Sequence, residues 1–168
     1  MPLVHPNTSE APLWRFPPKR REYPFTAWRA WRLSGIEDGW YLESLAANVL
    51  WEQPVIKSDF PPLDPKAWGH GQKTDPAHVI NTSGIWTVYD RVHALLVAQL
   101  YRAEVFGEVS LWGRVARHEL GYRAEWCMIK KLLLYLPICR NKGWHRYQLE
   151  SAVIGLERRY GCDVEVVH

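Results

Sequence analysis

The segment Glu108–Ile129 reads EVSLWGRVARHELGYRAEWCMI and decides how the rest of the chain is interpreted. It alternates apolar and polar residues on both sides of Leu120-Gly121, a pattern typical of two strands joined by a tight turn. The segment therefore predicts a β-hairpin. It also contains many side chains that can carry charge, transfer protons or stack on a ligand, namely Trp112, Arg114, His118, Glu119, Arg123, Glu125 and Trp126.

A two-residue turn at Leu120-Gly121 would place Glu119 opposite Tyr122 and His118 opposite Arg123. Because strand side chains alternate between faces, this register sorts the hairpin into a polar face and an apolar face. Gly113, in the middle of the first strand, indicates a β-bulge or a close approach by another group. The polar face would carry Trp112, Arg114, His118, Arg123, Glu125 and, by the same register, Cys127. The apolar face, interpreted as core, would carry Val109, Leu111, Gly113, Val115, Ala124, Trp126 and Met128.

The polar face has two interpretations. Its two arginines and its histidine could hold an anion such as a phosphate while Trp112 stacks on a base. The same residues are also typical of cross-strand ion pairs on a solvated sheet face. His70 is a further candidate ligand-binding residue because Gly69 and Gly71 flank it, although a solvated loop histidine gives the same pattern.

The remaining pattern predicts an α+β fold, a strongly bent antiparallel sheet or a small β-barrel with two main helices. Asp90 is a good N-cap for a helix from Arg91 to about Arg102, in which Val92, Leu95, Leu96, Leu100 and Tyr101 recur near helical spacing. The second helix, Trp144–Tyr160, is followed by Gly161 at the position that favours glycine. Pro137 would end the second hairpin strand. Further strands are expected at 27–33, 40–50, 84–89 and 164–167, and a long loop at 52–83.

The length of 168 residues indicates one domain, here 25–168, preceded by an arm at 1–24 that is rich in proline and basic residues. Ten tryptophans make the chain tryptophan-rich, and a formal net charge of +3 makes it mildly basic. Three cysteines, no apolar leader and no long apolar run favour a cytoplasmic protein without a membrane segment. No Gly-rich phosphate loop, metal motif or activated nucleophile is evident, so no cofactor, metal or catalytic residue is predicted.

The segments Gly84–Trp86 (GIW), Glu108–Val115 (EVSLWGRV) and His118–Glu125 (HELGYRAE) resemble an uncharacterised small bacterial domain family. That family has a GIYA motif and an LWGxVxxHExGYRAE motif, and the resemblance covers roughly 28–167. Many members approach the GIYA strand through cysteines, which 76–83 (PAHVINTS) lacks. The resemblance implies one coherent fold in which the hairpin is central, and it implies no reaction.

We therefore expect a non-catalytic recognition module that binds nucleic acid, DNA or RNA, through the Arg/His/Trp face of the hairpin. A flipped or modified base is one such ligand, since PUA-like domains, which read bases, combine strands and helices in a comparable way. One alternative is a protein-interaction adaptor or inhibitor from a mobile element or defence system. Another is a small-molecule or nucleotide sensor, or an enzyme acting on one. The oligomeric state is left open.

Overall fold

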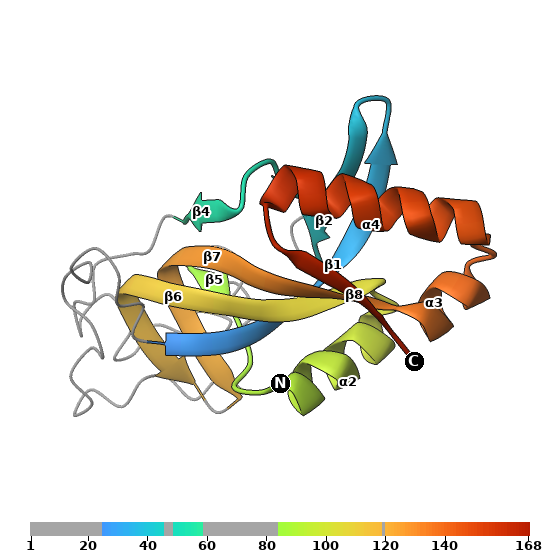
Figure 1. Cartoon of the computed structure of the whole chain (residues 1–168). Coiled ribbons are helices and arrows are strands. Elements are labelled where there is room, and N and C mark those ends of the chain that lie inside the picture. The colour runs from blue at the N-terminus through green and yellow to red at the C-terminus, as the bar shows by residue number, and fades with distance from the viewer. Residues whose placement is uncertain (1–24, 46–48, 59–83, 119) are drawn as a thin grey trace.

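The computed structural model describes residues 25–45, 49–58, 84–118 and 120–168, and for residues 114 and 116–118 it describes the backbone alone. The predicted arm at 1–24 and His70 lie outside the described residues. Within them the chain is an α+β domain (Figure 1). The strands are β1 (Phe25–Ile36), β2 (Gly39–Ser44), β3 (Leu50–Trp51), β4 (Val55–Lys57), β5 (Ile85–Trp86), β6 (Val105–His118), β7 (Gly121–Tyr135) and β8 (Asp163–Val167). The helices are α2 (Arg91–Tyr101), α3 (Leu136–Asn141) and α4 (Arg146–Tyr160).

The predicted hairpin is the centre of the sheet. One edge of β7 pairs with β6 along its length, and the other edge pairs in turn with β5, β4 and β8. Beyond β6 the order continues through β1 and β2 to β3. All of these pairs are antiparallel except β7–β8, because α4 carries the chain back over the sheet before β8 begins. β6 and β7 therefore pair directly with β1, β4, β5 and β8.

The sheet is open, so the small-barrel alternative is wrong. The strands run from β3 at one end to the group β5, β4 and β8 at the other, without a continuous ladder that joins these ends. One isolated bridge, Trp28–Val88, brings the segment after β5 against β1, with backbone hydrogen bonds of 2.8 Å in both directions. A single bridge of this kind does not close the sheet into a barrel.

Two apolar layers cover the two faces of the sheet. Figure 1 shows α4 on one side of the sheet and α2 on the other. The main core lies on the α4 side and the second core on the α2 side. The main core includes Trp31, Leu42, Trp51, Leu111, Cys127, Leu156 and Tyr160. The second core includes Ala30, Val88, Ala94, Ala98, Phe106, Leu133 and Tyr135.

The C-terminal helix and its ends agree with the sequence pattern. Ala152, Leu156 and Tyr160 are buried on one face of α4, and Leu149 and Val153 pack beside them. Gly161 ends the helix with φ +61°, and its N–H donates to the carbonyl oxygen of Glu157 at 2.8 Å. These features confirm the predicted helix.

The first predicted helix is also confirmed, but its orientation differs from its apolar pattern. The Asp90 carboxylate accepts a hydrogen bond from the His93 N–H at 2.9 Å and caps α2 as expected. The residues that α2 buries completely are the small Ala94 and Ala98. Small side chains let the helix axis approach the sheet closely. Leu95 and Val97 pack beside them against the second core, whereas Val92, Leu96 and Leu100 are exposed.

Candidate functional site

A row of three side chains runs from β6 across β7 to β4. Trp112 pairs with Trp126, and Trp126 pairs in turn with Lys57. The two indole planes are tilted by 8° and their centroids lie 5.8 Å apart. The Lys57 ammonium lies 5.3 Å from the Trp126 ring centroid. We call Trp112, Trp126 and Lys57 the tryptophan–lysine row.

The row lies on the face of the sheet opposite the main core. Leu111 and Cys127, the neighbouring cross-strand pair, are both fully buried in that core. Since adjacent strand residues point to opposite faces, Trp112 and Trp126 point away from the core. Both indoles are half-buried and Lys57 is exposed. The row therefore offers aromatic surface and one positive charge to solvent.

A β-bulge at Gly113 produces this arrangement. The ladder shifts between Trp112 and Val115, so that two residues of β6 oppose one residue of β7. Gly113 has φ +79°, a left-handed conformation that other residues adopt at a steric cost. A Cβ atom at this position would lie 2.8 Å from Cδ1 of Trp126. Glycine therefore allows both the bulge and the close packing of the Trp126 ring, as its position in the strand predicted.

The predicted register is wrong because of the turn and the bulge together. The last paired residues are His118 and Gly121, and Leu111, rather than Arg114, lies opposite Cys127. Val109, Leu111, Val115 and Ala124 are fully buried, as expected for the apolar face. Trp126, expected in the core, is instead half-buried beside Trp112.

The predicted site residues do not all lie together at the surface. Trp112 is in the tryptophan–lysine row. The half-buried Glu125 directly precedes Trp126 on β7. Arg123, expected on the polar face, is only 2% exposed. Burial lowers the pKa of Arg123 to about 10, so the guanidinium stays charged at neutral pH but is withdrawn from solvent. The backbones of Arg114 and His118 lie in β6, and their side chains are outside the described residues.

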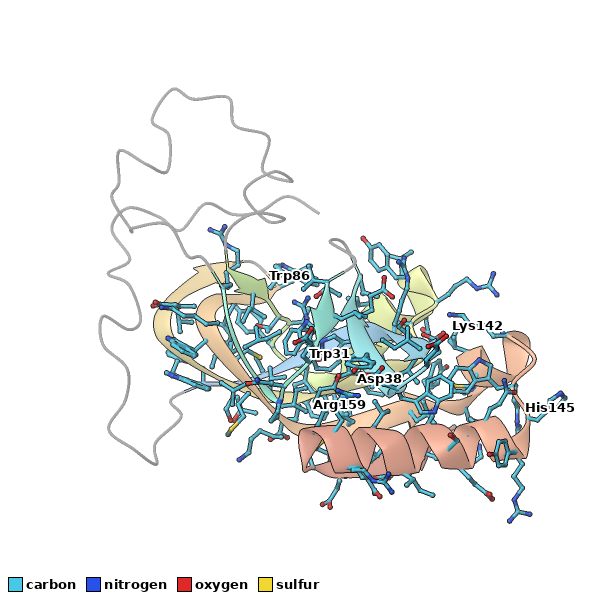
Figure 2. The ribbon with its side chains drawn as sticks, turned by 90° about the horizontal axis from the view of Figure 1, so that it is seen from above. Trp31, Asp38, Trp86, Lys142, His145 and Arg159 are labelled. Atoms are coloured by element: carbon cyan, nitrogen blue, oxygen red, sulfur yellow. The ribbon has the colours of Figure 1, made fainter. Side chains whose placement is uncertain are left out.

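A second cationic cluster, on β1, was not expected as a site. Arg29 donates to the carbonyl oxygen of Trp86 and, at 3.2 Å, to Oγ of Ser44. Its guanidinium carbon lies 5.3 Å from the ring centroid of Trp51, which itself donates to Ser44 Oγ at 2.9 Å. Figure 2 shows Trp86 and Trp31 on the strands around this cluster. Burial lowers the pKa of Arg29 to about 10.

Arg29 joins four strands, which is a structural role. Trp28 and Trp31 lie near Arg29 in β1, where a cation–π contact within the strand would be the simplest arrangement. The contact is made instead with Trp51 of β3, a partner that only the folded sheet brings near. Two buried donors of this cluster, Nε of Arg29 and Nε1 of Trp31, have no hydrogen-bond partner among the described residues. The sequence contains no signal for this arrangement.

A third polar cluster fastens α4 to the turn between β1 and β2. The Arg159 guanidinium carbon lies 3.4 Å from the ring centroid of Tyr41, and Nε of Arg159 donates to the carbonyl oxygen of Trp40 at 2.9 Å. The Tyr41 hydroxyl donates to Asp38 at 2.5 Å, which raises the pKa of Tyr41. Figure 2 shows Asp38 and Arg159 close to each other. These side chains contact one another within the domain, and the contacts hold α4 against β2.

The two buried thiols of the core have low reactivity. Cys127 and Cys139 are buried, and burial raises the pKa of both thiols to about 12. Neither therefore forms a reactive thiolate at neutral pH. Among the residues that the structure describes, no three His, Cys, Asp or Glu side chains gather to hold a metal ion. No helix in the same part of the chain is long and apolar enough to cross a membrane.

Comparison with known protein families, curated proteins and solved structures gives no match to this chain. The resemblance to the small bacterial domain family therefore stays a prediction. The tryptophan–lysine row remains the described feature whose chemistry points to a ligand, because it combines accessible aromatic surface with an exposed cation.

Proposed function

We propose that this protein is a non-catalytic module that binds single-stranded nucleic acid and that the tryptophan–lysine row is its contact surface. The observation that carries the proposal is the near-parallel pair Trp112–Trp126 on the sheet face away from the main core. Indole rings in an apolar core pack in many orientations. A parallel pair held half-buried outside the core is the arrangement of a stacking platform.

The chemistry of the row suits a nucleotide in two ways. A base stacked on the accessible indole surface contributes about 1–3 kcal/mol to binding, with little dependence on base identity. Lys57, on the next strand, adds a positive charge within reach of the adjoining phosphate, and this contribution weakens as salt is added. The net charge of +3 favours the same partner weakly.

The structure changes the role proposed for the arginines. Anion binding by Arg123 would require its guanidinium to leave a site where it is 2% exposed. Lys57 therefore replaces Arg123 as the proposed phosphate contact, and Arg123 is proposed to support the hairpin from within. A flipped or modified base as the preferred ligand, and a PUA-like architecture, remain predictions.

Fluorescence anisotropy with labelled single-stranded DNA and RNA tests the proposal. Trp112→Ala is expected to weaken binding roughly 5- to 100-fold, which corresponds to the loss of one stacked base. Lys57→Gln is expected to lower the salt dependence by about 0.7 in the slope of log K against log salt concentration.

Two controls match these variants. Tyr147→Ala removes an aromatic ring that is 80% exposed on α4, on the other side of the sheet. Arg158→Gln removes the same charge as Lys57→Gln from an exposed position on α4. Both controls are expected to bind like the unchanged protein. No binding at low salt, or equal effects of Trp112→Ala and Tyr147→Ala, would overturn the proposal.

A further inference from the structure

The core-facing side of β1 holds a positive charge without a negative partner. The Arg29 guanidinium contacts the carbonyl oxygen of Trp86, the hydroxyl of Ser44 and the indole ring of Trp51, all of which are neutral. None of the ion pairs found within the described residues includes Arg29. Burial lowers the pKa of Arg29 to about 10, so its side chain is still charged at neutral pH. A buried charge is costly unless an opposite charge compensates it.

The Cys127 thiol, which interacts electrostatically with Arg29, does not supply that opposite charge. Cys127 is fully buried, and burial raises its pKa to about 12 although the Arg29 charge acts in the other direction. The thiol is therefore protonated and neutral at pH 7. The Arg29 guanidinium thus lacks a compensating anion within the described part of the fold.

The surroundings of Arg29 contain more hydrogen-bond donors than acceptors. Nε of Arg29 and Nε1 of Trp31 are buried and have no partner among the described residues. Ser44 Oγ accepts hydrogen bonds from Arg29 and from Trp51, and a hydroxyl whose two lone pairs are used still has its proton to donate. Buried donors normally have an acceptor. Three donors are therefore available here to an acceptor from outside the described chain.

These three donors belong to neighbouring side chains. Trp31 and Ser44 lie opposite each other in the β1–β2 ladder, and Arg29, two residues before Trp31, points to the same face of β1. The Trp51 indole packs against all three residues. Its ring centroid lies 5.3 Å from that of Trp31 and 5.3 Å from the Arg29 guanidinium carbon, and its N–H donates to Ser44 at 2.9 Å. We call Arg29, Trp31 and Ser44 the β1 donor cluster.

We propose that the β1 donor cluster binds a small oxyanion, namely the carboxylate or phosphate group of a small molecule. An oxyanion supplies both the acceptors that the three donors need and the negative charge that Arg29 lacks. A water molecule would supply the acceptors alone and would leave the charge uncompensated. The bound group must be small because Trp31, Trp51 and Ser44 are 0%, 2% and 8% exposed.

The cluster is open to solvent at one residue and is separate from the tryptophan–lysine row. Arg29 is half-buried, whereas the other two members are buried, so an anion would enter beside Arg29. Trp31 belongs to the main core, and the row lies on the opposite face of the sheet. The inference therefore does not rest on the proposed function.

Thermal unfolding at pH 7 with added acetate or inorganic phosphate tests the inference, with potassium chloride at equal ionic strength as the reference. Tm is expected to rise saturably, by roughly 3–6 °C when the free anion is at ten times its Kd. A response to acetate alone would assign a carboxylate ligand, and a response to phosphate alone a phosphate ligand.

Two arginine variants separate binding at the cluster from a general effect of salt. Arg29→Met keeps a long side chain without its charge and is expected to abolish the response. Arg159→Met is the matched control, because Arg159 is another half-buried arginine that packs on an aromatic ring. It should respond like the unchanged protein. An equal response in Arg29→Met would be the general stabilisation that excluded salts give, and would overturn the inference.

The indole N–H signal of Trp31 tests the site in the unchanged protein, so the result does not depend on how a variant folds. Trp31→Phe identifies this signal in a ¹H–¹⁵N spectrum. It is expected to shift as the stabilising anion is added, because its N–H gains an acceptor. The Trp40 signal should stay in place, since its N–H already donates to Ser151 at 3.0 Å. No saturable rise in Tm with either anion, or a Trp31 signal that does not move, would overturn the inference.

Discussion

Gly113→Ala is expected to destabilise the domain by about 1.5–3.5 kcal/mol. Two contributions add up. Placing an alanine at φ +79° costs about 1–2 kcal/mol. The new Cβ would also lie 2.8 Å from Cδ1 of Trp126, so the Trp126 ring must move and its stacking on Trp112, worth about 0.5–1.5 kcal/mol, is lost.

Gly143→Ala isolates the first contribution, the cost of the backbone conformation. Gly143 has a similar φ of +76°, but a Cβ atom at that position would have nothing within 4 Å. This variant should therefore lose only the conformational part, about 1–2 kcal/mol. The difference between the two alanine variants measures what the bulge does for the tryptophan pair.

Urea denaturation followed by far-UV circular dichroism measures both variants, and unchanged m-values would show that compactness is preserved. For a chain of this size, each kcal/mol corresponds to roughly 2–4 °C in Tm. If Gly113→Ala loses no more stability than Gly143→Ala, the described packing of Trp126 against the bulge is wrong.

Three further outcomes follow from the same structure. Gly121→Ala should prevent folding, or cost more than about 4 kcal/mol, because its Cβ would lie 1.9 Å from the Thr87 carbonyl oxygen; a normal Tm would contradict this close approach. Glu104→Ala should cost about 3 kcal/mol in denaturant titrations, since Glu104 is 3% exposed and pairs with Lys142; a loss under about 1 kcal/mol would contradict a buried ion pair. Asp90→Ala should lower Tm at pH 7. Because folding lowers the pKa of Asp90, this difference should persist above the unfolded pKa of about 3.9 and disappear as pH falls through the folded pKa; a pH-independent difference would argue against the charged cap.

Local signals in the sequence predicted the ends of the two main helices. Asp90 and Gly161 bound their helices as expected because capping depends on one residue and its immediate backbone. Pro137 stands at the start of α3, where the second hairpin strand gives way to helix. These outcomes need no long-range information.

The faces of the hairpin were harder to predict because a register is a cumulative property. Counting in twos assumes an uninterrupted ladder, and one inserted residue reverses the side on which every later residue lies. The bulge at Gly113 therefore put Cys127 into the core and Trp126 beside Trp112. The glycine predicted a bulge, but nothing in the sequence specified where the turn would begin.

The outward face of α2 was missed for a different reason. Its larger apolar residues form a helical pattern, and such a pattern does not say which side packs on the sheet. Ala94 and Ala98 are the residues of α2 that are fully buried, and Leu95 and Val97 pack beside them against the second core. Arg29 and Trp51 likewise come from separate strands, so their contact depends on the completed fold.

The indole N–H signals in a ¹H–¹⁵N spectrum test the central claim most directly. Each of the ten tryptophans gives one such signal, and Trp112→Phe and Trp126→Phe identify the two that belong to the row. On adding short single-stranded DNA or RNA, the signals of Trp112 and Trp126 are expected to shift most, while those of Trp40 and Trp144, paired on the α4 side, stay in place. Binding that shifts the Trp40 and Trp144 signals and leaves the row unchanged would contradict the account.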